Sequence, residues 1–159
     1  MIVVSDSSPL IALAAVRQLA LLSSLYGDVI VPPTVWAEVT RAGRPGVAEI
    51  LASNWIRVVP VSNLTLLNNV SAEVDAGEAE AITLAHELNA DALLLDERRA
   101  RRTATRLGIP LTGVLTVLVT AKSMGLVPTI KPILDDMALL VNFRLKSSLY
   151  DATLKAAGE

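Results

Sequence analysis

The sequence predicts an α/β fold built on a mostly parallel central sheet of about five strands. Short runs rich in β-branched and other apolar residues alternate with longer stretches of helical periodicity. This alternation is typical of a parallel sheet covered by helices on both faces. At 159 residues and 52% hydrophobic content, the chain is long and apolar enough for one domain with a sizeable core.

The predicted strands and helices follow one another in a regular order. Strands are expected at residues 2–5, 29–31, 56–59, 92–95 and 109–111. Helices are expected at 9–25, 33–42, 47–53, 77–89, 97–107 and 114–124, and two further helices at 131–140 and 147–156. We therefore expect a single domain over residues 1–159, with its core at about 1–124 and a helical extension at about 128–159 packed at the edge.

Composition limits the chemistry that the chain can perform. The absence of cysteine excludes disulfides, zinc–thiolate sites and thiol catalysis, and the single His86 excludes a site of several histidines. His86 is also predicted on the outer side of its helix. No phosphate-binding glycine motif is present. Catalysis would therefore depend on carboxylates, hydroxyls, lysine and arginine.

Charge and hydropathy bear on location and partners. A net charge of −2 gives no global preference for nucleic acid, so such binding would need a local patch. The N-terminus lacks the pattern of a signal peptide, and no apolar run is long enough to span a membrane, so we expect a cytoplasmic protein without a membrane partner. The high mean hydropathy of +0.51 predicts an oligomer interface, and we expect a homodimer.

Two acids directly follow predicted strands. Asp6 follows the first strand and Asp96 the fourth, so both are expected at the edge of the sheet where α/β proteins bind ligands. Helix capping is the alternative interpretation. It is weak for Asp6, since Pro9 suits a first helical position and makes Ser8 the better cap, and it stays open for Asp96.

Two more acids come from predicted helices. In the helix at 77–89, Glu78 is expected at the edge of the buried face, whereas Glu80 is expected to face solvent beside Glu87. The alternative for Glu78 is a capping box with Asp75. Glu38 flanks the apolar stripe of the helix at 33–42, and its alternative is an ordinary solvated glutamate.

Converging carboxylates would repel one another unless cations neutralise them. Divalent ions such as Mg²⁺ or Mn²⁺ prefer oxygen ligands and balance the charge. A site of this kind can activate water and stabilise the leaving oxygen of a phosphodiester. If the four acids meet, the sequence indicates metal-assisted hydrolysis.

Four segments carry a resemblance to a known family: "VVSDSSPLIAL", "VWAEV", "GEAEAITLA" and "LLLDERRAR". In this order they resemble the PIN-domain nucleases, in particular small prokaryotic members related to VapBC-type toxin ribonucleases. The resemblance implies a three-layer α/β/α fold and a metal-dependent endoribonuclease using Mg²⁺ or Mn²⁺. It also implies RNA as substrate and an antitoxin protein as a partner.

The resemblance assigns the metal-binding and catalytic roles to four residues: Asp6, Glu38, Glu78 and Asp96. The third position holds Glu78 where many toxin members have aspartate. Ser7 and Ser8 stand where threonine and asparagine are more usual. Two roles for Ser8 remain open, a contact to a metal-bound water or substrate phosphate, and helix capping.

Substrate contacts are predicted from a basic helix directly after Asp96. Arg98, Arg102 and Arg106 lie at i, i+4 and i+8, where they would hold RNA phosphates; a solvated face paired with glutamates is the alternative. Near the C-terminus, Phe143, Leu145 and Leu149 in "MALLVNFRLKSSLY" are expected to dock a second protomer or an antitoxin, or only to pack at the edge.

Two other functions compete with the ribonuclease. The first is a PIN-like RNA- or partner-binding regulatory module with weak or no catalysis, which glutamate at the third acidic position and the acidic pI near 5.4 both favour. The second is a small-molecule phosphohydrolase that uses the same metal site.

Overall fold

The computed structural model describes residues 1–159 and has one five-stranded sheet in the order β3-β2-β1-β4-β5. The strands are β1 (Val3–Ser5), β2 (Val29–Val31), β3 (Ile56–Val58), β4 (Ala92–Leu94) and β5 (Leu111–Thr112). Every pair of neighbouring strands is parallel, so the predicted α/β class is confirmed and the sheet is parallel throughout.

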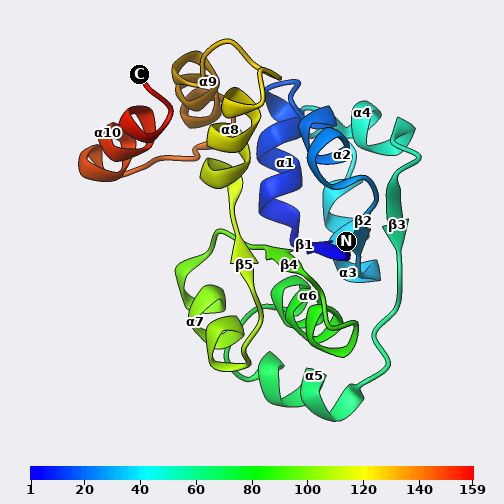
Figure 1. Cartoon of the computed structure of the whole chain (residues 1–159). Helices are drawn as coiled ribbons and strands as arrows, with labels where there is room; N and C mark the ends of the chain where they lie inside the picture. The colour runs from blue at the N-terminus through cyan, green and yellow to red at the C-terminus, as the bar shows by residue number, and fades with distance from the viewer.

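Ten helices surround the sheet in a three-layer α/β/α arrangement. They are α1 (Ser7–Ala15), α2 (Ala20–Tyr26), α3 (Pro33–Val39), α4 (Val47–Ala52), α5 (Leu64–Ser71), α6 (Ala76–Glu87), α7 (Arg98–Arg106), α8 (Val114–Ser123), α9 (Lys131–Val141) and α10 (Ser147–Ala156). Helices α1, α2, α8 and α9 lie on one side of the sheet, and α5, α6 and α7 on the other (Figure 1). Helix α3 contacts both α1 and α6, so it links the two layers. None of the helices combines the length and the apolarity needed to cross a membrane.

The predicted helix at residues 9–25 is wrong, because the chain turns after Ala15 and forms two helices. Arg17 adopts a left-handed conformation with φ of 59°. The amide of Arg17 donates to the carbonyl of Ala14, and that of Gln18 donates to the carbonyl of Leu13. These two bonds form the Schellman arrangement that ends many helices, usually with glycine at the left-handed position. Because arginine rather than glycine occupies this position, the end of α1 could not be recognised from the sequence.

The short helix α5 was also absent from the sequence prediction. Its polar residues include Asn68, Asn69 and Ser71, which are weak helix formers. A cap starts the helix instead, since the side chain of Asn63 accepts a hydrogen bond of 3.0 Å from the amide of Leu66. Packing against α6 then provides the tertiary support that a short helix needs.

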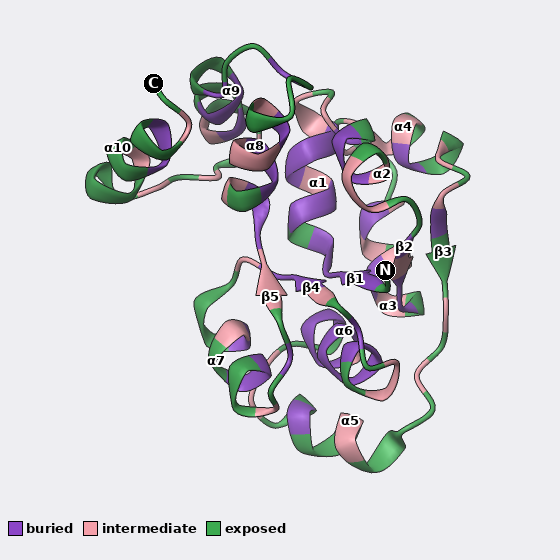
Figure 2. Cartoon of the chain, in the orientation of Figure 1, coloured by how far each residue is buried: buried purple, intermediate pink, exposed green.

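The buried core places the carboxyl end of β1 at the centre of the sheet. Strand β1 pairs with β2 and β4, and all three of its residues are buried. Figure 2 shows the buried residues concentrated in β1, β4, α1 and α6. Beyond the strand, the amide of Asp6 donates to the carbonyl of Leu94 at 2.9 Å. This bond fixes the first residue after β1 against the end of β4.

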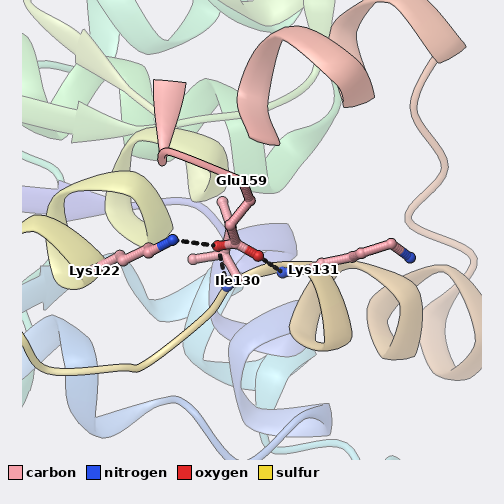
Figure 3. Close-up of polar contacts among 4 residues, drawn as sticks. All are labelled: Lys122, Ile130, Lys131 and Glu159. Carbon is pink, nitrogen blue, oxygen red and sulfur yellow. Dashed lines mark hydrogen bonds and ion pairs between the residues drawn. The ribbon is translucent and has the colours of Figure 1, made fainter. Parts of the chain in front are cut away.

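The last residue attaches the C-terminal helix to the rest of the domain (Figure 3). The carboxylate of Glu159 accepts hydrogen bonds from the amides of Ile130 at 2.7 Å and Lys131 at 3.2 Å, and it pairs with Lys122 Nζ at 3.0 Å. The amide of Ile130, followed by Lys122 and Lys131, lowers the pKa of Glu159. The carboxylate thus satisfies amides at the start of α9 and anchors the end of α10 beside α8 and α9.

We predict that Gly46→Ala destabilises the packing of α4 on α1. Gly46 has φ of 83°, and a Cβ there would lie 2.6 Å from the carbonyl carbon and Cβ of Ala14. Overpacking and left-handed strain together should lower the free energy of unfolding by about 3 kcal/mol, measured by urea denaturation. Gly43→Ala is the matched control, because Gly43 also has positive φ but no atom within 4 Å. It should cost only about 1 kcal/mol. Equal losses in the two variants would contradict this description of the α1–α4 contact.

Candidate functional site

Asp6 is a buried carboxylate at the central edge of the sheet. It directly follows β1, and only 3% of the residue is exposed. It occupies the N-cap position of α1, yet its side chain accepts no capping bond, and Oδ1 has no hydrogen-bond partner. The prediction of Ser8 as the helix cap is wrong, since α1 begins at Ser7 and Ser8 is exposed. No helix-capping role therefore explains why Asp6 is buried.

Other carboxylates lie close enough to affect the ionisation of Asp6. The pKa of Asp6 is raised to about 7, mainly by burial, with a smaller contribution from the charges of Glu78, Asp75 and Glu38, while the amide of Ser7 opposes the shift. A carboxyl group whose pKa lies near neutral pH, surrounded by other carboxylates, is a frequent feature of functional sites.

Glu78 combines the two roles that the sequence left open. It is buried on α6 as predicted, with 8% exposure. It also forms the capping box: its amide donates to Asp75 Oδ1 at 2.8 Å, and its Oε1 accepts from the amide of Asp75 at 3.1 Å. Burial, and then repulsion from Asp75, raises the pKa of Glu78. In this conformation one of its carboxylate oxygens is engaged in starting the helix.

Glu38 reaches from the end of α3 to the beginning of α6. Its Oε2 accepts a hydrogen bond of 2.7 Å from the hydroxyl of Ser7. Its Oε1 lies 2.5 Å from the point where a Cβ on Gly77 would stand, so the glycine leaves room for the carboxylate. Glu38 is half-buried and forms no ion pair, so the solvated-glutamate interpretation is wrong. The Ser7–Glu38 contact had no sequence signature, because it joins residues 31 positions apart.

Asp96 lies against the beginning of α8, much as Glu38 lies against the beginning of α6. Its Oδ1 and Oδ2 accept from the amide of Val114 at 3.2 and 3.4 Å, and Oδ1 lies 2.5 Å from the Cβ position of Gly113. Glu97, rather than Asp96, caps α7 by accepting from the amide of Ala100. Asp96 therefore does not cap the helix that follows it in the sequence, as the alternative interpretation had it, but accepts from the first amide of α8 instead. Burial raises the pKa of Asp96, while the amide of Val114 and the charge of Arg101 oppose the shift.

The four predicted acids thus fall into two neighbouring groups. The charges of Glu38 and Glu78 raise the pKa of Asp6, whereas the charged neighbour of Asp96 is Arg101. The register contributes to this separation, because Ser5 pairs with Leu94 and Asp96 lies one residue farther along its strand than Asp6 does. As the side chains stand, no three Asp, Glu or His residues form a group that could hold one metal ion.

The basic helix α7 turns a different arginine inward from the ones predicted. Arg98 and Arg102 are exposed and form no ion pair, while Arg106 pairs with Glu73. Arg101 instead points back to the sheet, where its Nη1 donates to the carbonyls of Leu95 at 2.5 Å and Thr112 at 3.3 Å. Arg101 is a site residue that the predicted stripe of Arg98, Arg102 and Arg106 missed.

Two surface predictions have opposite outcomes. His86 is exposed, as predicted. Glu80 is half-buried rather than turned to water, and burial raises its pKa, helped by the charge of Glu38 and opposed by the backbone of Thr34. Glu80 therefore adds another carboxylate to the α3–α6 contact.

Comparisons with known proteins identify one family. A family model described as a PIN domain matches residues 2–159. No curated protein matches the chain significantly.

We predict that Asp6→Asn stabilises the metal-free protein above neutral pH. The folded-state pKa of Asp6, about 7, exceeds its ordinary value of 3.8, so the folded state holds the proton longer than the unfolded chain does. The unfolding free energy of the wild type should therefore fall as pH rises from 4 to 7, and it should level off above that. At pH 8 the asparagine variant should be more stable by up to about 4 kcal/mol, since the pKa rises by about three units and each unit is about 1.4 kcal/mol.

Urea denaturation in buffer with a chelator measures this difference at each pH. Asp136→Asn is the matched control, because Asp136 is exposed and forms no ion pair. It should leave the unfolding free energy unchanged over the same range. A difference between wild type and Asp6→Asn that stays constant from pH 4 to 8 would contradict the burial of an ionisable carboxylate here.

Proposed function

The chain belongs to the PIN-domain family, a nuclease-type fold, and we propose that it is a divalent-metal-dependent endoribonuclease. The proposed metal-binding and catalytic residues are Asp6, Glu38, Glu78 and Asp96. The observation that carries the proposal is the buried Asp6 carboxylate, with one oxygen unpartnered and the carboxylates of Glu78, Asp75 and Glu38 close by.

This set of donors suits a hard divalent cation such as Mg²⁺ or Mn²⁺. All four residues offer carboxylate oxygens, and Asp6 Oδ1 is buried without a donor that would otherwise satisfy it. The repulsion that raises the pKa of Asp6 would be relieved by a positive charge. A bound cation would supply charge stabilisation at the phosphodiester and a more acidic water.

The protein's own residues would prepare the site in distinct ways. Asp6 would provide a fixed ligand, because the bond from its amide to Leu94 anchors its backbone. Ser7 holds Glu38 toward α6, and Glu38 and Glu78 would rotate away from their present hydrogen bonds to share the cation. Asp96 would orient water or a second cation from the α8 side. Exposed Arg98, Arg102 and Ser8 would contact phosphates of the RNA.

A specific observation favours the second candidate, a PIN-like RNA- or partner-binding module with weak or no catalysis. The acids do not form a group that could hold an ion as they stand, and Glu78 is committed to its capping box. Forming the cation site would cost that capping interaction, about 1 kcal/mol. The two candidates differ in whether RNA is cleaved or only bound.

Several features of cellular context stay predictions. We propose a cytoplasmic toxin with an antitoxin protein partner, and a homodimer whose contacts use exposed apolar residues near the C-terminus such as Leu139 and Leu149. Light scattering that gives the mass of one chain at micromolar concentration would remove the dimer. Expression that leaves bacterial growth unaffected would remove the toxin role.

We predict that Asp6→Asn reduces RNA cleavage by about 100-fold or more while the fold is retained. The amide keeps the shape of the side chain but loses the charge that would hold the cation. Cleavage of single-stranded and structured RNA is measured in Mg²⁺ or Mn²⁺, with EDTA as the metal-free reference and Asp136→Asn as the control. Equal cleavage by wild type and Asp6→Asn would contradict the mechanism. Binding of RNA without cleavage by the wild type in either metal would favour the second candidate.

We predict that Gly77→Ala lowers cleavage without lowering stability. The added Cβ would meet Glu38 Oε1, the free end of a flexible side chain, so the carboxylate moves rather than the backbone. Alanine is also the better helix former, so the free energy of unfolding should stay equal or rise by about 0.5 to 1 kcal/mol. Cleavage should fall by about tenfold, as for loss of a metal-site contact. Glu38→Gln is the companion variant, and wild-type cleavage by both would exclude Glu38 from the site.

A further inference from the structure

A cleft of about 410 Å³ opens beside Asp96, away from the Asp6 group. One side of the cleft is formed by the sheet edge and α8, with Asp96, Arg101 and Gly113. The opposite side, which we call the outer wall, is the segment between α9 and α10, with Phe143, Arg144 and Leu145. The volume lies at the small end of the range for ligand sites, about 300 to 1,000 Å³. The cleft is thus large enough for a group the size of a nucleotide and adjoins a proposed catalytic acid.

The cleft carries two guanidinium groups that form no ion pair, although Arg101 lies close enough to Asp96 to affect its pKa. Arg144 Nε donates to the side-chain oxygen of Asn142 at 2.7 Å, and Arg101 uses Nη1 to reach the carbonyls of Leu95 and Thr112. Neither arginine belongs to any of the ion pairs in the protein. Both therefore retain N–H donors for an anion. With Asp96 as the acid in the lining, the net charge favours a negatively charged ligand.

Asp135 shares a cavity with Phe143, Arg144 and Leu145, but other groups already bind its carboxylate. Asp135 accepts from the hydroxyl of Tyr150 at 2.7 Å and from Lys131 Nζ at 2.9 Å. It lines a separate cavity behind the segment, which shares the wall residues with the cleft. Arg144 is therefore left without a neutralising partner between the two cavities.

The wall also presents an aromatic and aliphatic surface at a defined place. Phe143, the single phenylalanine of the chain, and Leu145 are half-buried in the lining of the cleft. The amide of Phe143 donates to the carbonyl of Met137, and Asn142 turns the chain there with φ of 56°. At the other end of α10, Glu159 fixes the helix to α8 and α9 (Figure 3). The wall is therefore tethered at both ends.

We propose that this cleft is a nucleotide subsite for single-stranded RNA, in which Arg144 and Arg101 bind a phosphate and Phe143 stacks on a base. The assignment rests on the proposed ribonuclease function and adds the residues that would hold the strand next to Asp96. Guanidinium groups pair well with phosphate, and aromatic stacking accepts any base. An unpaired nucleotide offers both an anion and an exposed ring to this combination.

Binding without hydrolysis tests the subsite directly. A fluorescein-labelled hexaribonucleotide is titrated with wild type, Arg144→Ala, Phe143→Leu and Lys146→Ala in EDTA, and anisotropy gives each dissociation constant. Arg144→Ala should weaken binding by about tenfold and Phe143→Leu by about five- to tenfold. Lys146 is exposed and outside the cleft lining, so Lys146→Ala should change the constant by less than about twofold. Equal weakening by Arg144→Ala and Lys146→Ala, or none with Phe143→Leu, would overturn the subsite.

Two further measurements guard the interpretation. Phe143→Trp should bind RNA with quenching of its added fluorescence, whereas an unquenched signal on a bound complex would overturn stacking. An acidic glutamate-rich peptide replaces the RNA in a parallel titration, and loss of peptide binding with Arg144→Ala while RNA binding persists would overturn the assignment to RNA.

Cleavage in Mg²⁺ is scored separately. RNA binding that depends on Phe143 and Arg144, without cleavage, would remove the ribonuclease function and keep the subsite. Cleavage that is unchanged by substitution of either residue would keep the ribonuclease function and remove the subsite.

Discussion

The arrangement of the candidate site depends on the burial of one ionisable side chain. Asp6 follows the central strand of an all-parallel sheet, where its backbone is fixed to β4 and its side chain is closed off from water. The carboxylate has an oxygen without a hydrogen-bond donor, and burial together with its acidic neighbours keeps its pKa near 7. A group in this position destabilises the folded protein unless a cation or a proton balances it. The chain keeps it at the edge of the sheet where α/β proteins bind ligands.

Two glycines extend this arrangement to the helices around the sheet. Glu38 lies over Gly77 in the first turn of α6, and Asp96 lies over Gly113 at the start of α8. Each carboxylate thus approaches the positive end of a helix at a point where any Cβ would interfere. The two helices lie on opposite sides of the sheet (Figure 1), so the acids reach its edge from both layers. In the present side-chain conformations, hydrogen bonds to Ser7, Asp75 and Val114 hold the outer acids apart.

Much of the fold was predictable because its signals are local. β-branched runs marked the strands. The placement of Glu78 toward the core was also correct, although α6 is buried around most of its circumference rather than on one face alone. The alternation of strands and helices similarly led to the α/β class. The break at Arg17 was not predictable, because arginine there adopts a backbone conformation usually left to glycine. The short helix α5 was missed because its asparagine and serine residues are weak helix formers, and the contacts that support it come from the Asn63 cap and from α6.

The candidate site was less accessible to sequence reasoning, because its details depend on contacts between distant residues. The four acids could be predicted from the ends of strands and the faces of helices. The separation of Asp96 from the other three could not. In the run around Arg101, several arginines share a helix, and only the three-dimensional structure shows which one turns back to the sheet. The Ser7–Glu38 bond and the role of Gly77 likewise require the α1–α3–α6 packing.

The most direct test of the central claim is the anomalous scattering of manganese in crystals soaked with MnCl₂. A divalent cation bound as proposed gives a peak about 2.1 Å from Asp6 Oδ1, with Glu38 or Glu78 rotated toward the same ion. The peak disappears in Asp6→Asn crystals soaked in the same way. Well-ordered crystals with manganese bound only elsewhere on the surface, and Asp6 unchanged, would contradict a metal site at the end of β1.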